Sequence, residues 1–296
     1  MTECGFITVI GSPNVGKSTL INALVGSKVT IVSHKVQTTR NRILGIALEG
    51  ETQLILVDTP GIFEDPKRRL EKAMVKSAWD SLGDADGVMV LVDVSHKNFT
   101  DTDRILSDLQ KYQKKVVVVL NKIDLIQREE LLSIAQHFSR SEIDRIFMIS
   151  ALKKDGIQDI KNYWAKNLPE GPWLFPEDQL SDLPERFLAA EITREELFHR
   201  LHEELPYSLW VETDSWEEFK NGSVKIVQSI YVQREGQRSI VLGKGGGQIK
   251  AIGEAARKQL TYILERPVHL FLHVKVKAGW MDNPRLYASI GLNFKV

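Results

Sequence analysis

The chain of 296 residues is 43% hydrophobic and 26% charged, proportions that are typical of a folded globular protein and exclude a disordered or fibrous one. Its formal net charge is zero, so the chain as a whole does not select an anionic or a cationic partner. The single cysteine, Cys4, excludes an internal disulfide and is typical of a reducing cytosol. The apolar runs have the length of strands, so we expect no signal segment and no membrane span, while peripheral membrane contact stays open.

The zero balance hides an uneven distribution of charge. From Lys220 to Val296, 13 Lys and Arg residues stand against 4 Asp and Glu, a balance of +9, so the preceding residues carry −9. A basic C-terminal third on an acidic remainder predicts an anionic partner for that third. The alternative is ordinary surface charge that is unevenly spread.

Residues 1–168 alternate strand-like and helix-like segments. Continuous runs of Val, Ile and Leu indicate strands buried on both faces of a mainly parallel sheet. These runs lie at Gly5–Ile10, Ile43–Leu48, Gln53–Asp58, Gly87–Val92, Lys115–Leu120 and Ile146–Ile149. Helices are expected at about 17–25, 67–82, 101–112, 128–138 and 156–168. A glycine turn at 49–51 predicts a hairpin between the second and third strands. The pattern predicts a doubly wound α/β domain, which binds ligands at the carboxyl ends of its strands.

Residues 11–18, GSPNVGKS, follow the first strand and fit the pattern G-x-x-x-x-G-K-[ST] of a phosphate-binding loop. Glycines let successive backbone N–H groups point at phosphate oxygens, and the next helix adds the positive end of its dipole. Lys17 would reach the β- and γ-phosphates, and Ser18 would ligate Mg²⁺. The expected nucleotide contacts here are Gly11, Ser12, Pro13, Asn14, Val15, Gly16, Lys17, Ser18 and Thr19. A glycine-rich turn without a ligand is the alternative.

Residues 58–61, DTPG, close the third strand. Asp58 can hold Mg²⁺ through a water molecule, and the backbone N–H of Gly61 can contact a γ-phosphate. Thr59 and Pro60 lie between them. This motif therefore predicts the metal side of the same site.

Two later motifs, NKID at 121–124 and SAL at 150–152, predict the base. Asp124 can accept hydrogen bonds from both N1–H and the exocyclic amine of guanine, a pair that adenine does not offer, so it selects GTP over ATP. Lys122 is expected along the base, and Asn121 is expected to brace the phosphate loop. Ser150 and Ala151 bring a backbone N–H near the guanine oxygen, and Leu152 completes the motif. Four motifs in this order, each after a strand, predict a guanine nucleotide site.

With these motifs the first 170 residues resemble the translation-factor-like class of small GTPases. The resemblance implies a loop between the first helix and the second strand that supplies a threonine to Mg²⁺ and the γ-phosphate. Residues 37–40, QTTR, lie there, and we expect Thr39 to be this ligand, with Thr38 as the second choice. The catalytic residues would be Asn14, Lys17, Thr39 and Gly61.

Ile62 departs from this class. Many GTPases carry a glutamine directly after the glycine of DTPG to orient the attacking water, and isoleucine has no polar atom for this task. Arg40 and Arg42 could act as an internal arginine finger, although exposed loop arginines are the simpler interpretation. The sequence therefore predicts slow hydrolysis. In related GTPases with a hydrophobic replacement, an asparagine at the position of Asn14 helps to hold K⁺ against the phosphates, so the resemblance implies stimulation by K⁺.

Residues 169–184 contain four prolines and predict an extended spacer between domains at 1–168 and 185–296. In the second domain we expect a helix over 185–205 and a long helix through about Leu264. Strands are expected at Leu209–Thr213, Val224–Gln233 and Val268–Val276.

Residues 243–246, GKGG, fit the G-x-x-G loop with which KH domains clamp a single-stranded nucleic-acid backbone. Glycines let phosphates approach the amides of the next helix, and Lys244 adds a positive charge. The order helix–strand–strand–helix–helix–strand matches the type II KH arrangement. The expected RNA contacts are Gly243, Lys244, Gly245, Gly246, Ile249 and Lys250. A flexible turn in an unrelated α+β domain is the alternative, and Lys275 and Lys277 could face either RNA or solvent.

A GTPase domain followed by a type II KH domain resembles the Era family of bacterial GTPases over essentially the full length. The matching segments are GSPNVGKS, QTTR, DTPG, NKID, SAL and VLGKGGGQIK. The resemblance implies a monomeric switch that uses GTP, GDP and Mg²⁺, grips the 3′ region of 16S rRNA and assists assembly of the 30S ribosomal subunit. It also implies a cytoplasmic protein with peripheral contact to the inner face of the membrane. The alternative is a nucleotide-gated RNA-binding scaffold whose hydrolysis is incidental.

Overall fold

The computed structural model describes residues 2–33, 35, 38–40, 42–63, 65–202, 205–289 and 291–295. Two segments of the sequence interpretation, Gln37 in the expected switch loop and 203–204 in an expected helix, lie outside these residues. The chain divides into two compact units, Met1–Asp182 together with Ile290–Val296, and Leu183–Ser289.

The described part of the first unit contains a six-stranded sheet of order β2-β3-β1-β4-β5-β6. Its strands are β1 (Glu3–Ile10), β2 (Ile43–Glu49), β3 (Thr52–Asp58), β4 (Gly87–Asp93), β5 (Lys115–Asn121) and β6 (Arg145–Ile149). β2 and β3 form the predicted antiparallel hairpin, and the remaining neighbours pair in parallel. Every residue of β3 and β4 is buried, which is why these strands carry continuous apolar runs. The predicted doubly wound α/β sheet is confirmed.

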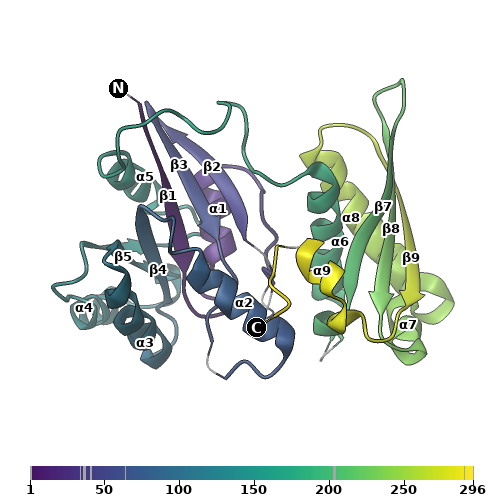
Figure 1. Ribbon diagram of the computed structural model, residues 1–296, viewed down its shortest axis with the longest axis horizontal. Coiled ribbons are helices and arrows are strands. Elements are labelled where there is room, and N and C mark those ends of the chain that lie inside the picture. Colours follow the sequence, from purple (N-terminus) through teal and green to yellow (C-terminus); the bar gives the residue numbers. More distant parts are fainter. Residues whose placement is uncertain are drawn as a thin grey trace. The chain divides into compact units, whose positions relative to one another are not determined.

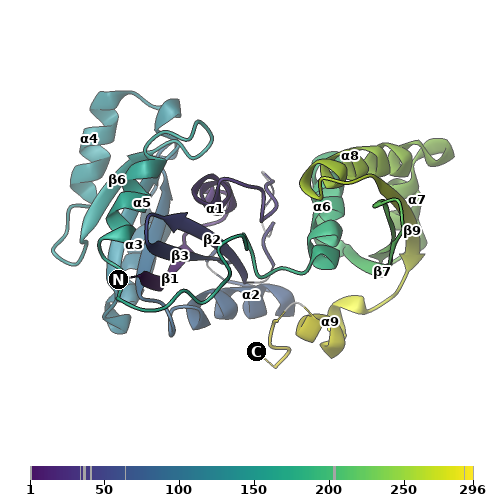
Figure 2. The same ribbon diagram turned by 90° about the horizontal axis from the view of Figure 1, so that it is seen from above.

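Helices cover both faces of this sheet. They are α1 (Lys17–Val25), α2 (Arg69–Asp80), α3 (Thr100–Leu109), α4 (Arg128–His137) and α5 (Ile157–Ala165), with 3₁₀ turns at Gln110–Tyr112 and Ile123–Leu125. Side chains of α1 and α5 enter one apolar core, and side chains of α2, α3 and α4 enter the other. Figure 2 shows α1 and α2 on opposite sides of the sheet. Trp164 of α5 is fully buried, and its truncation to alanine would cost about 3–5 kcal/mol of stability.

The proline-rich segment contains no helix, but it packs on the first unit instead of spanning open solvent. Trp173 and Phe175 lie against an apolar cluster of Cys4, Leu44, Ile55 and Val57. The carbonyl of Leu180 accepts the N–H of Ile46 at 2.9 Å. The side chain of Asp182 accepts the N–H of Leu44, also at 2.9 Å. These contacts satisfy backbone groups of β2, the edge strand of the sheet.

The second unit packs helices on one face of a three-stranded sheet of order β7-β8-β9 (Figure 1). The strands are β7 (Trp210–Glu218), β8 (Val224–Val232) and β9 (Val268–Val276), with β7 antiparallel and β9 parallel to β8. The helices are α6 (Glu185–Arg200), α7 (Glu235–Leu242), α8 (Gly247–Ile263) and α9 (Pro284–Ser289), with 3₁₀ turns at Pro206–Ser208, Lys244–Gly246 and Trp280–Asp282.

The second unit differs from the sequence prediction at three places. α6 ends at Arg200, earlier than expected, and β7 continues to Glu218 beyond a bulge between Thr213 and Ser215. The added half of β7 is polar except for Trp216, so an apolar run could not reveal it. Glu217, for example, pairs with Lys225 across the ladder at 3.5 Å. The short helix α9 was not predicted at all.

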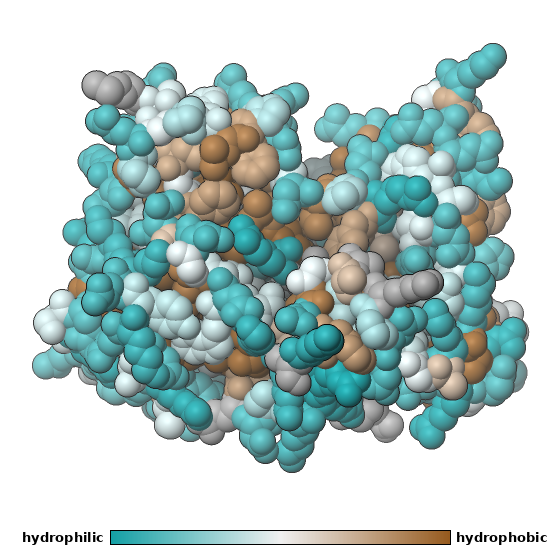
Figure 3. Space-filling view, viewed as in Figure 1, coloured by the Kyte–Doolittle hydropathy of each residue, from teal (hydrophilic) through white to brown (hydrophobic). Residues whose placement is uncertain are grey.

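The surface in Figure 3 is mainly hydrophilic, with scattered hydrophobic patches. Across the described residues, we find no helix that combines the length and the apolar character needed to span a bilayer.

Candidate functional site

The phosphate-binding loop joins β1 to α1, as its pattern predicts. Gly16 caps α1 in the left-handed conformation, with φ 99°. A Cβ atom at this position would lie 2.4 Å from Nδ2 of Asn121, so both the backbone conformation and the space require glycine. The loop therefore fits closely against the end of β5.

Lys17 is buried at the floor of this loop. Its Nζ donates hydrogen bonds to the carbonyls of Gly11 and Ser12, at 3.0 and 2.9 Å. Burial lowers the pKa of Lys17 to about 8, although the nearby Asp58 carboxylate opposes this change. The acceptors of this ammonium group are neutral carbonyls, and a bound phosphate would add an anionic partner.

Hydroxyl groups surround Asp58 at the end of β3. Its Oδ2 accepts hydrogen bonds from Ser18, Thr30 and Thr39, at 2.9, 2.8 and 3.2 Å. Burial raises the pKa of Asp58, and these hydrogen bonds oppose the rise. The structure thus brings Ser18, Thr39 and Asp58 together, as expected for a metal site.

This cluster fits Mg²⁺. Oδ1 of Asp58 is buried and receives no hydrogen bond from any residue that the structure describes. A buried carboxylate oxygen beside two hydroxyl groups provides the hard oxygen donors that Mg²⁺ prefers. Thr38 is placed differently, because its hydroxyl donates to the carbonyl of Lys35 at 2.6 Å. Of the two threonines that the sequence left open, Thr39 is the one beside Ser18 and Asp58.

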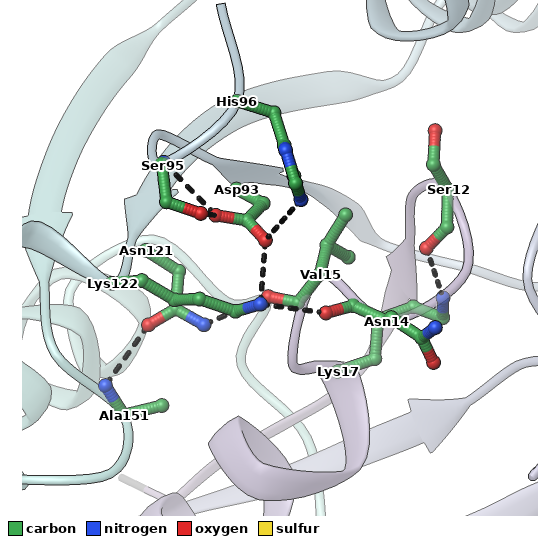
Figure 4. Close-up of polar contacts among 10 residues, drawn as sticks. All are labelled: Ser12, Asn14, Val15, Lys17, Asp93, Ser95, His96, Asn121, Lys122 and Ala151. Atoms are coloured by element: carbon green, nitrogen blue, oxygen red, sulfur yellow. Dashed lines mark hydrogen bonds and ion pairs between the residues drawn. The ribbon is translucent and has the colours of Figure 1, made fainter. Parts of the chain in front are cut away.

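Asn121 joins three loops at the base end of the site. Its Nδ2 donates to the carbonyl of Val15 at 2.8 Å, and its Oδ1 accepts the N–H of Ala151 at 2.9 Å (Figure 4). Asn121 therefore braces the phosphate loop and also fixes the SAL segment beside it.

Asp124 lies next to Ser150 and Lys153. The hydrogen bond from the Ser150 side chain, with the charge of Lys153 at 3.7 Å, lowers the pKa of Asp124. The carboxylate is therefore ionised at neutral pH, which is the state that accepts two N–H groups of guanine.

A cavity of about 530 Å³ connects these groups. It is lined by predicted site residues from all of the motifs, namely Pro13, Asn14, Gly16, Lys17, Ser18, Thr19, Thr39, Thr59, Gly61, Asn121, Lys122, Asp124, Ser150 and Leu152. The other predicted residues, Gly11, Ser12, Val15, Asp58, Pro60 and Ala151, lie outside this lining.

Sequence reasoning missed several residues of this site. Ile31, Val32, Ser33 and Lys35 also line the cavity, and Thr30 bonds to Asp58. No motif marks them. Asp93, which contacts Lys122, could have been found, because it ends β4 and so obeys the rule that polar residues at strand ends form the site.

Ile62 and the nearby arginines do not supply a polar group to the cavity. The side chain of Ile62 is buried in the apolar core beneath α3, and its N–H donates to the carbonyl of Gly11 at 3.1 Å. Arg40 is also buried, and Arg42 lies over the ring of Phe6. The cavity lining includes neither arginine.

The glycine loop of the second unit joins α7 to α8. Gly243 has φ 72°, and a Cβ there would lie 2.6 Å from Cβ of Gln248, so this position requires glycine. Lys244 at the tip and Lys250 on α8 are exposed, whereas Ile249 packs partly into the core of the unit. Gly247, the extra glycine, is helical, with φ −63° and ψ −38°. Helix α8 therefore begins directly at the loop, with its N-terminal amides beside Lys244.

Lys275 and Lys277 both lie over the ring of Tyr231, at 5.9 and 5.2 Å from its centroid. Lys275 is also 3.4 Å from Asp214. Contacts within the second unit therefore hold both lysines.

The fold and the site together define a GTPase of the phosphate-loop class that carries a C-terminal KH domain. Residues 6–122 match the family described as 50S ribosome-binding GTPase, and residues 204–281 match the KH domain family. The chain is 55% identical to GTPase Era of Afipia carboxidovorans, over 99% of this chain and 95% of that protein. GTPase Era of Rhizobium meliloti is also 55% identical, over 99% of this chain and 94% of its own length. The chain belongs to the Era family of GTPases.

Two solved structures of the family share the fold of the whole chain. One is Era in complex with MgGDPNP and nucleotides 1506–1542 of 16S ribosomal RNA, 39% identical, with a TM-score of 0.91 over 98% of this chain and 99% of that one. The other is a variant of Aquifex aeolicus Era bound to GDP·AlF4⁻, 38% identical, with the same TM-score and coverage. GTP, GDP and Mg²⁺ are the ligands of this GTPase family.

Proposed function

We propose that this chain is a GTP-operated switch that grips the 3′ region of 16S rRNA and assists assembly of the 30S ribosomal subunit. The convergence of the strand-end motifs on one cavity carries the nucleotide half of this proposal. The glycine loop in the basic C-terminal third supports the RNA half. The family member solved with nucleotides 1506–1542 of 16S rRNA supports the choice of RNA, because it aligns with both units of this chain.

In the nucleotide site, Asp124 would select guanine and Lys17 would neutralise the β- and γ-phosphates. Ser18 and Thr39, with Asp58 behind them, would hold Mg²⁺, which when bound offsets charge on the phosphate oxygens. The N–H of Gly61 would contact the γ-phosphate. Because Ile62 is buried and offers no polar atom, no side chain at this position orients water, and we expect slow hydrolysis.

In the RNA site, residues 243–246 would let phosphates approach the first amides of α8, and Lys244 and Lys250 would add positive charge. α8 has 17 residues, long enough for a full helix dipole at this end. Ile249, half-buried beneath the loop, would offer an apolar contact to a base. The second unit would thus bind single strands rather than duplexes.

The experiment that tests this function is crosslinking to total RNA with GTP or GDP bound, followed by mapping of the crosslinked segment. We expect the 3′ region of 16S rRNA and different yields with the two nucleotides. Replacing Lys244 and Gly245 by Asp should lower RNA affinity at least about 100-fold, because phosphates would meet two negative charges, without changing GTP binding. Lys258→Asp, the same lysine-to-aspartate substitution farther along α8, is the control for the change at Lys244.

The second candidate is an RNA-binding scaffold gated by nucleotide, and the burial of Ile62 is the observation that favours it. Single-turnover GTP hydrolysis with and without the crosslinked RNA separates the two functions. A switch is accelerated by its RNA, whereas a scaffold hydrolyses GTP at the same rate in both conditions.

The exposed Asn14 in the phosphate loop supports a further part of the proposal, stimulation of hydrolysis by K⁺. We also propose a monomer in the cytoplasm, with a GTPase domain at 1–168 and a KH domain at 185–296. Peripheral contact with the inner face of the membrane belongs to the same proposal. Cell fractionation tests it, since contact would place part of the protein in the membrane fraction until salt releases it.

A further inference from the structure

The carboxylate of Asp93, at the end of β4, is held from two sides. Asp93 pairs with Asn121 in the parallel ladder, so β4 and β5 end at the same level. Its Oδ1 accepts hydrogen bonds from the N–H and the hydroxyl of Ser95, at 3.0 and 2.6 Å. Its side chain is only 6% exposed. The orientation of this carboxylate is therefore fixed within the strand end (Figure 4).

The second oxygen of Asp93 bonds to Lys122. Nζ of Lys122 contacts Oδ2 of Asp93 and also donates to the carbonyl of Asn14, at 2.9 Å. Figure 4 shows the lysine reaching from β5 to the phosphate loop, with Asp93 beside its Nζ. Lys122 is thus the link between the end of β4 and the loop that surrounds the phosphates.

The two residues that this hydrogen bond joins both have left-handed backbones. Lys122 has φ 68° and Asn14 has φ 65°, a region that lysine rarely adopts and that asparagine tolerates better. Such conformations persist where surrounding contacts hold them. The contacts that hold this pair include the hydrogen bond between Lys122 and Asn14 and the ion pair between Lys122 and Asp93.

We propose that Asp93 is a positioning residue for guanine nucleotide binding. Its carboxylate holds Lys122 in the conformation that contacts the base, and through Lys122 it holds the backbone of Asn14 in its binding conformation. Burial alone would raise the pKa of Asp93, but the hydrogen bonds from Lys122 and Ser95 lower it below its usual value. The carboxylate of Asp93 is therefore charged at neutral pH and forms an ion pair with the ammonium group of Lys122.

A surface ion pair would not have this effect. Lys76 and Asp80 on α2 form such a pair at 3.0 Å, with side chains 45% and 61% exposed, and pairs of this kind contribute little. The ion pair between Asp93 and Lys122 is much less exposed. Its lysine also donates to the carbonyl of Asn14, a residue that lines the nucleotide cavity. His96 also approaches Oδ2 of Asp93, at 3.6 Å, but its side chain is 77% exposed.

The test is the dissociation rate of fluorescently labelled GDP from the full-length protein. Asp93→Asn keeps the size of the side chain and removes its charge, and we expect GDP to dissociate about tenfold faster, since a charge-assisted hydrogen bond is lost. Ser95→Ala frees only Oδ1 and should accelerate dissociation less, about two- to threefold. Asp80→Asn, the matched loss of a carboxylate at the exposed pair, should leave the rate unchanged.

A double-mutant cycle with Lys122→Met separates positioning from a general structural role. If Asp93 acts through Lys122, then Asp93→Asn has no further effect once the lysine is gone. An unchanged rate in Asp93→Asn, or effects of the two substitutions that multiply, would overturn the proposal. If Asp93→Asn fails to fold, the same cycle is measured with Ser95→Ala in its place. Ser95→Ala should then have no further effect on GDP dissociation in the Lys122→Met background.

The proposal rests on guanine nucleotide binding by the wild-type chain. A wild type that fails to bind labelled GDP would overturn the function itself. A wild type that binds GDP, with an indifferent Asp93→Asn variant, would overturn only the role of Asp93.

Discussion

Gly16 and Asn121 fit together so closely that a single added carbon on the glycine would meet the amide of the asparagine at 2.4 Å. Asn121 therefore leaves no room for a side chain at position 16, although the two residues are 105 positions apart in the sequence. The end of β5 lies directly against the phosphate loop and supports its shape. Substitutions at the end of β5 therefore test how firmly the loop is held.

Asn121→Ala removes the hydrogen bonds to the carbonyl of Val15 and from the N–H of Ala151, and it leaves both buried groups without a partner. We expect GDP affinity to fall about 10- to 100-fold, equivalent to about 1.4–2.8 kcal/mol, because nucleotide binding must overcome part of the about 1–3 kcal/mol that each unsatisfied group costs. Isothermal titration measures this loss. Asn162→Ala, at an exposed hydrogen bond on α5, is the control, and equal affinities in both variants would refute the bracing role.

Thr39→Val and Thr38→Val are a matched pair, because each removes one hydroxyl from adjacent positions. Thr39 bonds to Asp58 and Ser18, whereas Thr38 bonds to the backbone carbonyl of Lys35. We expect Thr39→Val to lower the rate of GTP hydrolysis about 10- to 100-fold, and Thr38→Val to lower it less than about threefold. Rates at several Mg²⁺ concentrations check this, and the reverse order would transfer the ligand role to Thr38.

Asn14→Gly tests stimulation by K⁺ without adding strain, because φ 65° is a conformation that glycine adopts freely. The substitution removes the side-chain amide from the cavity and keeps the carbonyl that Lys122 contacts. We expect wild-type hydrolysis to be faster in K⁺ than in Na⁺, and the variant to hydrolyse at the same rate in both. GDP affinity, which does not depend on the γ-phosphate, is the control. Equal wild-type rates in the two salts would remove the K⁺ hypothesis.

Nucleotide binding should take up a proton above pH 8. Burial lowers the pKa of Lys17 to about 8 in the nucleotide-free protein, and bound phosphates favour its charged form and raise that pKa again. Below pH 8 the lysine is charged in both states, and affinity does not change. Above pH 8 the free lysine loses its proton, so GDP affinity falls by up to about tenfold per pH unit. Titration calorimetry in two buffers counts the protons, and no uptake at pH 9 would contradict the prediction.

The sequence predicts those features of the fold and the site that depend on residues close together in the chain. Each strand of the first unit is a continuous apolar run, and the site motifs occupy short windows after these runs, so both could be placed before the structure. Thr30 could not be assigned in this way, because its role comes from its partner Asp58, which is distant in the chain. The strand-end rule marks Asp93, but only the structure reveals its contact with Lys122. α9 has six residues, too few to display a helical period.

The packed proline-rich segment has a consequence for any attempt to isolate the GTPase half of this protein. A truncation after residue 168 would remove Trp173 and Phe175 from the apolar cluster of β1, β2 and β3 and would leave the outer edge of β2 unpaired. An exposed apolar edge strand invites other chains to pair with it. A fragment that ends at Asp182 keeps its own cover, and we expect it to stay dispersed at concentrations at which the shorter fragment aggregates.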